Sequence, residues 1–176
     1  MCFYLIAGDS YPIGVDYTKM NAATYDTSSK FDRVLADVPC LSDRVSCTVA
    51  DNNIFKTTRV KERLGLVKQQ KRILASGLEC LKKTEGSACV YSTCTMSPIE
   101  NDGAVVAALN EVDREDLKID LNSLWNVLAP LQEAKMYKLE RTKCGIQIIP
   151  YLVSNCGPMF VSRIVVAKTQ QRGENM

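Results

Sequence analysis

The chain has 176 residues, 46% hydrophobic and 24% charged, with a formal net charge of +2. This is enough for one domain with a real core, and the apolar runs are too short to cross a membrane. There is no histidine and no C-x-x-C pair, which argues against a zinc site, and the eight cysteines follow no secretory signal or compact spacing, which favours reduced thiols.

The first half of the chain shows strand-like stretches separated by a long helical one. Continuous apolar runs predict buried strands of the kind found in parallel sheets, and leucines at near-helical spacing predict an amphipathic helix. These patterns predict strands over 15–20, 31–38 and 88–91, and a helix over about 59–82. Lys82 and Lys83 suit the negative end of that helix, and Gly86 supplies the break.

A second helix is predicted to begin close to Cys94. The letters SPIE match a capping box, with Ser97 as N-cap, Pro98 at the first helical position and Glu100 reaching back. The helix then runs from Pro98 to about Asn110. Its positive end would face Cys94 and favour the reactive thiolate.

The last third of the chain returns to strands. Alternation predicts a strand over 117–121, followed by a short helix that Asn122 or Ser123 caps and Pro130 ends. Two late strands, 146–149 and 159–166, form a terminal antiparallel pair. This succession of strands and helices indicates an α/β sheet.

Two cysteines occupy matching places in this pattern. Cys40 and Cys94 each follow a buried strand, and one helix lies between the two strands. Ligands bind beyond the carboxyl ends of such strands, so both thiols should open into one crevice, with Asp37 just before Cys40. A cysteine is commonly a small buried apolar residue, and we interpret the other six cysteines in this way. For Cys40 or Cys94 considered alone, the same interpretation is the alternative to a chemical role. The two together with Asp37 favour a chemical role.

The letters around these residues, FDRVLADVPC ending at Cys40 and VYSTCTMSPIEN containing Cys94, resemble the NSUN/NOL1/RsmB family. These are RNA cytosine-5 methyltransferases that depend on S-adenosylmethionine. Further matches in CLSDR, NNIFK, RVKER and NCGPM resemble the mitochondrial ribosomal-RNA branch. The resemblance covers roughly 15–167, between an N-terminal stretch over 1–14 outside the family and a polar tail over 168–176.

The resemblance implies a fold and a mechanism. The fold is the C-terminal part of a Rossmann-like class I methyltransferase sheet. The cysteine matching Cys94 adds to cytosine C6, the one matching Cys40 assists product release, and the carboxylate matching Asp37 lies by the cofactor and the base. Aligning a third cofactor motif places Asn21 and Ala22 at the adenine. Asn21 stands where the family has aspartate, and its amide oxygen can still accept a hydrogen bond. The alternative is that Asn21 is only a turn residue without a role in cofactor binding.

The resemblance also implies RNA as partner, a possible MTERF-type helical-repeat protein partner, and a mitochondrial location, with no membrane or metal. A base that is attacked at C6 must be unpaired or flipped out. Residues 56–83 hold nine Lys/Arg against two Glu. Such a run is commonly a solvated helix face, and the alternative is contact with RNA phosphates. The candidates for that contact are Lys56, Arg59, Lys61 and Arg63.

Two family elements are missing: the glycine-rich cofactor loop and the acidic residue of the following strand. Without those first strands, strand 31–38 should become an exposed apolar edge. We therefore expect a fragment or short isoform of a longer methyltransferase. The alternatives are a non-catalytic paralogue or isoform that keeps an RNA- or partner-binding surface, and a thiol redox protein, which the lack of C-x-x-C disfavours.

Overall fold

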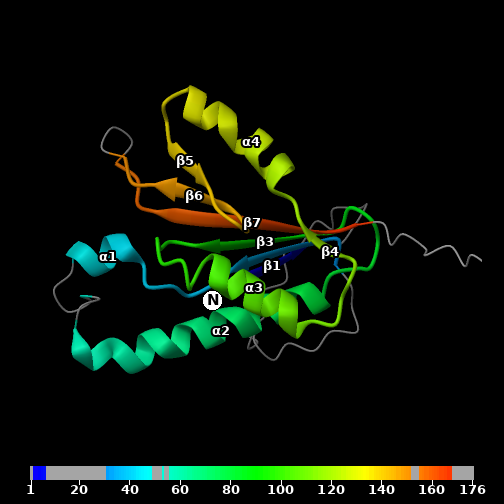
Figure 1. Ribbon diagram of the computed structural model, residues 1–176, viewed down its shortest axis with the longest axis horizontal. Helices are drawn as coiled ribbons and strands as arrows, with labels where there is room; N and C mark the ends of the chain where they lie inside the picture. The colour runs from blue at the N-terminus through cyan, green and yellow to red at the C-terminus, as the bar shows by residue number, and fades with distance from the viewer. Residues whose placement is uncertain (1, 7–30, 49–52, 54–55, 152–154, 168–176) are drawn as a thin grey trace, which may run out of the picture.

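The computed structural model describes residues 2–6, 31–48, 53, 56–151 and 155–167. These residues form one mixed sheet with helices on both faces (Figure 1). The strands are β1 (Cys2–Ile6), β2 (Arg33–Asp37), β3 (Ala88–Thr93), β4 (Leu117–Ile119), β5 (Lys138–Arg141), β6 (Ile146–Ile149) and β7 (Met159–Val166). The helices are α1 (Asp43–Thr48), the 3-10 turn η3 (Thr57–Arg59), α2 (Val60–Glu79), α3 (Asp102–Glu111) and α4 (Leu121–Glu133).

The sheet has the order β1-β2-β3-β7-β6-β5. β2 and β3 are parallel and are joined by the crossover through α2, whereas β7 runs antiparallel to β3. The other edge of β7 is shared by β6 along its first half and β4 along its second half. The strands predicted at 31–38, 88–91, 146–149 and 159–166 are therefore confirmed, as is the mixed α/β sheet. The strand predicted over 117–121 is confirmed over 117–119, and Leu121 belongs to α4.

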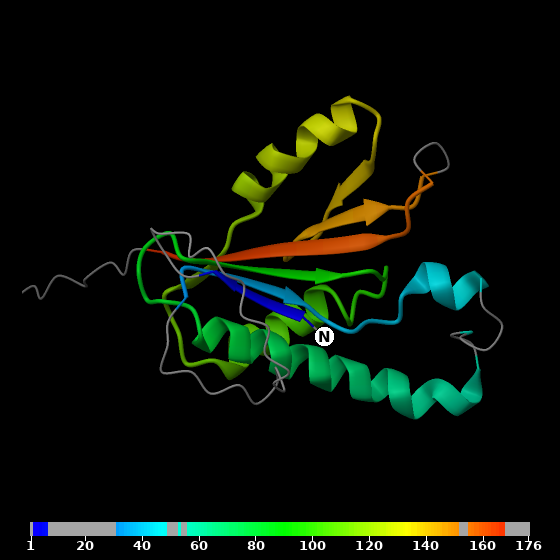
Figure 2. The ribbon, with the colours of Figure 1, turned by 180° about the vertical axis from the view of Figure 1, so that it is seen from behind.

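The expectation of an open edge beside strand 31–38 is wrong. β1 pairs antiparallel with β2 in a register that sets Cys2 opposite Asp37 and Ile6 opposite Arg33. Strand β1, the apolar segment over 2–6, thus takes the edge hydrogen bonds of β2, which removes the exposed edge that we expected there. Figure 2 shows this strand lying along β2 from behind. The strand predicted at 15–20 lies outside the described residues.

The alternation of each strand divides the apolar side chains between two cores on opposite faces. One core lies under α2 and α3 and receives the even-numbered residues of β7, such as Phe160 and Ile164, whose side chains are fully buried. The ring of Phe160 meets Tyr91 of β3 edge to face, with the centroids 6.3 Å apart. The smaller core lies under α4 and receives Val161 of β7 and Ile148 of β6. The strands that end before the two cysteines, β2 and β3, are thus packed by the first core, whereas α4 packs on β5, β6 and β7.

The predicted boundaries of α2 and α4 are wrong. α2 ends at Glu79 rather than near residue 82, because the chain turns into a bridge between Leu81 and Phe31. α4 is capped by Asp120, which accepts a hydrogen bond from a backbone N–H at 3.0 Å, and it continues through Pro130. Strand β5 was not predicted, since only one of its four residues, Leu139, is buried.

Candidate functional site

The loop after β3 does not lead directly into a helix, so the predicted capping box is wrong. α3 begins at Asp102, and its N-cap residue Asn101 makes no side-chain capping bond. The segment from Ser97 to Asn101 is instead a turn, closed by the Ser97 carbonyl, which accepts from two backbone N–H groups at 3.1 Å. The positive end of α3 therefore begins eight residues after Cys94, and Glu100 is free for another contact.

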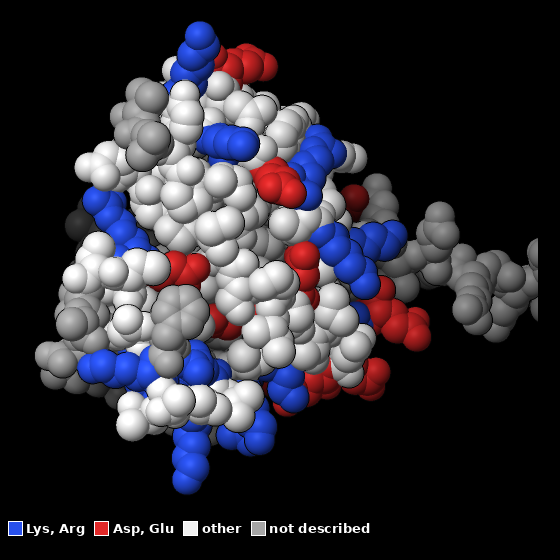
Figure 3. Space-filling model, turned by 60° about the vertical axis from the view of Figure 1, so that its left-hand side comes forward, with Lys and Arg blue, Asp and Glu red and all other residues white. Residues whose placement is uncertain are grey.

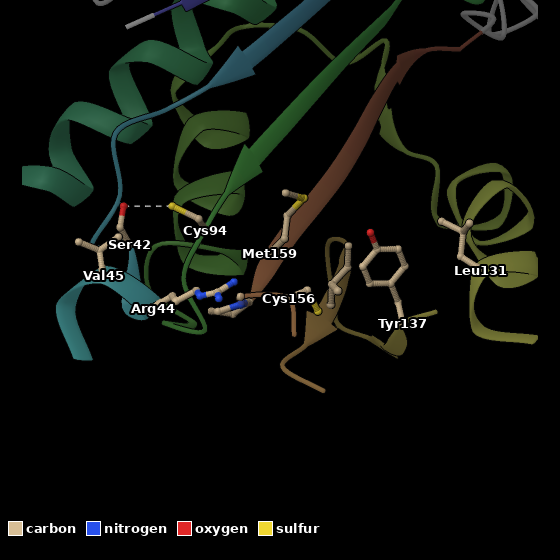
Figure 4. A pocket seen from close by; sticks show the side chains of 11 residues that line it. Ser42, Arg44, Val45, Cys94, Leu131, Tyr137, Cys156 and Met159 are labelled. Carbon is tan, nitrogen blue, oxygen red and sulfur yellow. Dashed lines mark hydrogen bonds between the residues drawn. The ribbon is translucent and has the colours of Figure 1, made fainter. Parts of the chain in front are cut away.

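The two cysteines that the sequence singled out lie side by side. Cys40 and Cys94 are free thiols whose Sγ atoms are 2.6 Å apart, and the backbone N–H of Cys94 points at the Cys40 sulfur at 3.1 Å. The hydroxyl of Ser42 lies 3.1 Å from the Cys94 sulfur, as Figure 4 shows. Cys94 is exposed, whereas Cys40 is half-buried behind it. The arrangement presents one sulfur to solvent and keeps the other within proton-transfer distance.

Burial gives Cys40 the properties of a protonated thiol. Burial first, and then the hydrogen bond with the Cys94 thiol, raise the pKa of Cys40 from 9.0 to about 11. At neutral pH Cys40 therefore holds its proton. Of the two thiols it is therefore the less available as a thiolate.

The loop that carries Cys94 is tied to the start of α1 by Asp43. The Asp43 carboxylate accepts from the Thr95 hydroxyl at 2.8 Å and from the Met96 backbone N–H at 2.7 Å. Its own backbone N–H donates to the Cys94 carbonyl at 3.2 Å. These bonds hold the loop that carries Cys94 on both sides of the cysteine.

The segment that carries Cys40 is held by a buried polar pair from two other elements. Glu100 accepts from the Leu41 backbone N–H at 3.2 Å and from the Gln70 amide at 2.9 Å. The same amide donates to the Pro39 carbonyl at 2.9 Å. Pro39 and Leu41 flank Cys40, so α2 and the turn before α3 fix the position of that thiol. Glu100 is only 2% exposed and the Gln70 side chain is fully buried, so this pair does not face solvent.

Asn101 connects the same turn to the sheet. Its side-chain amide donates to the Thr95 carbonyl at 3.0 Å and to Gln147 at 2.9 Å, and its oxygen accepts from the Thr93 hydroxyl at 2.6 Å. All three partners are almost fully buried. The end of β3, the loop that carries Cys94 and β6 are thereby joined in one hydrogen-bonded unit.

The remaining predicted site residues are placed as follows. Asp37 ends β2 with an exposed side chain that accepts from the Ser92 hydroxyl at 3.2 Å. Its neighbours Ala36 and Val38 point into the α2–α3 core, so its carboxylate lies on the opposite face of the sheet. Asn21 and Ala22 lie outside the described residues.

The four candidate RNA contacts lie at the start of α2. Lys56 and Lys61 have exposed side chains. Arg59 forms a bidentate pair with Glu62, with N–O distances of 2.8 and 2.9 Å, and Arg63 donates to the Lys56 carbonyl at 3.4 Å. Figure 3 shows Lys and Arg side chains gathered along the lower edge of the molecule, over this end of α2. The basic character predicted for this stretch is therefore presented at the surface.

A cavity of about 490 Å³ opens beside Cys94, between α1 and the layer of α4, β5 and β6 (Figure 4). Its walls are largely apolar. The residues that line it are Ser42, Arg44, Val45, Cys94, Leu131, Tyr137, Ile148, Cys156, Gly157, Pro158 and Met159. Arg44 crosses one side of it and donates to the backbone and side-chain oxygens of Asn155 at 2.8 and 3.2 Å.

Several residues of this site were not predicted. Asp43 and Arg44 were visible in the letters CLSDR, but only as a match to a branch of a family. Glu100 was assigned to a helix cap, and Gln70 gave no signal because it sits within a basic helix. Among the described residues, no cluster of metal-ligating side chains is present, and no described helix is long and apolar enough to cross a membrane.

Comparison with known proteins gives one consistent family. The family model described as 16S rRNA methyltransferase RsmB/F matches residues 11–164. The 5-cytosine rRNA methyltransferase nsun-4 of Caenorhabditis elegans is 36% identical over 143 residues, covering 80% of this chain and 30% of that protein. The 5-cytosine rRNA methyltransferase NSUN4 of Xenopus laevis is 33% identical over 149 residues, covering 80% of this chain and 34% of that protein. The chain thus spans about a third of the length of these relatives.

Solved structures share the fold. NSun6 from Pyrococcus horikoshii, crystallised with SFG, superposes with a TM-score of 0.60 at 20% identity, over 89% of this chain and 36% of that one. The crystal structure of PH0851 gives a TM-score of 0.53 at 21% identity, over 78% of this chain and 27% of that one.

Proposed function

Because the chain belongs to the 16S rRNA methyltransferase RsmB/F family, we propose that it carries the catalytic half of an S-adenosylmethionine-dependent RNA cytosine-5 methyltransferase. The observation that carries this proposal is the contact of Cys40 with the exposed Cys94 at the ends of two parallel strands. Two thiols in contact, one exposed and one held protonated, suit an addition followed by an elimination.

In the proposed mechanism, Cys94 is the nucleophile. Its thiolate adds to C6 of cytosine, the C5–C6 double bond opens, and its electron pair makes C5 nucleophilic. S-adenosylmethionine, when bound, supplies the methyl group that C5 takes up. Transfer of the C5 proton to a water molecule then restores the double bond and expels the Cys94 sulfur as a thiolate. The Ser42 hydroxyl, 3.1 Å from that sulfur, can hydrogen-bond it while it carries charge.

Cys40 is proposed to serve the elimination step. Its thiol touches the Cys94 sulfur, so its S–H can hydrogen-bond the negative charge that forms on that sulfur as the sulfur leaves. Gln70 and Glu100 would hold Cys40 in this position through the backbone on either side of it.

Asp37 is the described residue that fits a cofactor at this edge. Its exposed carboxylate stands at the carboxyl end of β2, where open α/β sheets bind ligands, and a carboxylate suits both a sulfonium and a cytosine amino group. Asn21 and Ala22 remain proposed as adenine contacts. The structural relative determined with SFG, an analogue of S-adenosylmethionine, supports this choice of cofactor.

We further propose ribosomal RNA as the substrate, which the names of the NSUN4 relatives support. The mitochondrion is proposed as the location from the resemblance to the mitochondrial ribosomal-RNA branch. Lys56, Lys61 and Arg63 are proposed to contact RNA phosphates. Arg59 can do so only by sharing its guanidinium with Glu62, so its contribution should be the smallest of the four. An MTERF-type protein remains a proposed partner.

The test is a covalent trap. The chain is incubated with S-adenosylmethionine and single-stranded RNA that contains 5-fluorocytosine, whose C5 cannot lose a proton. We expect a denaturation-resistant protein–RNA adduct that maps to Cys94 and is absent in Cys94→Ala. The matched control is Cys47→Ala, which removes another exposed thiol, in α1, and should leave the adduct unchanged. An adduct at any other cysteine, or none, would overturn the proposal.

A further inference from the structure

The cavity beside Cys94 extends well beyond Cys94 and Ser42, the two lining residues that the proposed chemistry uses. It extends from Cys94 and Arg44 on one side to Leu131 and Tyr137 on the other (Figure 4). We propose that this cavity binds the base of the nucleotide next to the cytosine that Cys94 attacks. This inference rests on the proposed function and adds a specificity site to it.

The walls suit a nucleobase better than a polar ligand. Tyr137 offers an aromatic ring, and Leu131, Ile148 and Met159 supply apolar surface around it. A planar base stacks on such a ring without needing a particular hydrogen-bond pattern. A volume of about 490 Å³ also lies in the range of ordinary small-ligand pockets.

Arg44 gives the cavity a contact for the backbone that joins the two nucleotides. Its guanidinium is oriented by two bonds to Asn155, at 2.8 and 3.2 Å, and a guanidinium has five N–H donors, so donors remain for a phosphate. Gly157 lets the arginine lie against the chain there, since a Cβ at that residue would sit 3.3 Å from the Arg44 Cβ and Cδ. Cys94 and Arg44 line the same cavity, so a strand held at Cys94 passes this cation.

The position of the cavity selects the neighbouring base and not the target itself. The proposed cofactor contact, Asp37, belongs to β2, whereas Leu131 and Tyr137 flank the opposite wall of the cavity, beyond β7 in the sheet order. The target cytosine must lie between Cys94 and the methyl donor, on the β2 side. The next nucleotide is therefore the part of the strand that can reach the Tyr137 wall.

The experiment measures RNA binding by fluorescence anisotropy, using the full chain and single-stranded RNAs with one abasic nucleotide. An abasic site directly next to the target, on one of its two sides, should weaken binding about 10-fold, the effect of losing one stacked base. An abasic site six nucleotides away is the control. Tyr137→Ala should weaken binding of the intact RNA by a similar factor and should have no further effect on the abasic RNA. Met136→Ala, an exposed neighbour outside the cavity, is the control variant.

Each outcome decides the inference. If abasic sites on both sides of the target bind as well as intact RNA, no base occupies the cavity and a protein side chain becomes its candidate occupant. Independent, multiplicative losses from Tyr137→Ala and the abasic site also overturn the inference, because they place the ring and the base apart. If RNA binding depends on the neighbouring base but no Cys94 adduct forms, the proposed chemistry is refuted, whereas the proposed base-binding role of the cavity is supported. Absence of RNA binding would refute both.

Discussion

Replacement of Asp43 tests whether the loop that carries Cys94 depends on this carboxylate. Asp43→Ala removes two hydrogen bonds to a charged acceptor, from Thr95 at 2.8 Å and Met96 at 2.7 Å. Bonds of this kind contribute about 1.5–3 kcal/mol each, and because Asp43 is only half-buried we take the lower figure, about 3 kcal/mol for the pair. Asp43→Asn keeps one acceptor oxygen and should lose about half of that.

The assay is urea unfolding followed by circular dichroism. With a slope of about 2 kcal/mol per molar urea, Asp43→Ala should lower the unfolding midpoint by about 1.5 M and Asp43→Asn by about half as much. Asp113→Ala removes an exposed carboxylate elsewhere and should leave the midpoint almost unchanged. If Asp43→Ala behaves like this control, the carboxylate does not hold the loop and our account of the site geometry is wrong.

Three further predictions follow from single residues. Arg114→Ala should destabilise the fold by about 3–5 kcal/mol in urea unfolding, because the arginine is buried against Asp116 and donates to two carbonyls at the end of α2. A loss of stability below about 1 kcal/mol would contradict this prediction. The pKa of Cys40 is raised from 9.0 to about 11, so the stability that this thiol contributes is complete below pH 9 and is lost as pH rises toward 11. Labelling of Cys40 by iodoacetamide, measured by mass spectrometry, should rise over the same pH range. Full labelling at pH 8 would contradict the assignment. Gly145→Ala should lower the free energy of unfolding by about 3 kcal/mol or more in thermal unfolding, since a Cβ there would lie 2.4 Å from a backbone oxygen and 2.6 Å from the Phe160 ring. A wild-type melting temperature for this variant would show that the backbone can move aside.

Features of the site that depend on local pattern and topology were predictable. An apolar run followed by Cys40, and a second followed by Cys94, predicted two buried strands, and the single helix between them made those strands neighbours. Proximity of the two thiols then follows from the rule that parallel strands end at the same edge. The resemblance of the same letters to a family gave the chemistry, which periodicity alone does not provide.

The errors arose where distant residues compete with local ones. Glu100 fits a helix cap in sequence, but the Leu41 N–H and the Gln70 amide, which are far away along the chain, take its carboxylate. α3 consequently starts later than the local pattern predicts. Pro130 was expected to end a helix, yet α4 continues past it to Glu133, and Leu131 in that last turn reaches the cavity wall.

The pairing of β1 with β2 could not have been read from the sequence. Residues 2–6 are apolar enough for a strand, but nothing in their letters specifies the partner or the antiparallel direction. The cavity was missed for a related reason. Its walls come from α1, α4, β6 and the chain before β7. A cavity formed by segments this far apart in the sequence cannot be predicted from local residue patterns.

The division of labour between the two thiols is tested most directly by comparing their alanine variants on RNA with ordinary cytosine and S-adenosylmethionine. We expect Cys40→Ala to accumulate a covalent adduct between Cys94 and methylated RNA, because the addition proceeds and the elimination stalls. Cys94→Ala should form no adduct. Equal absence of adduct in both variants, or an adduct in Cys94→Ala, would contradict the assigned roles.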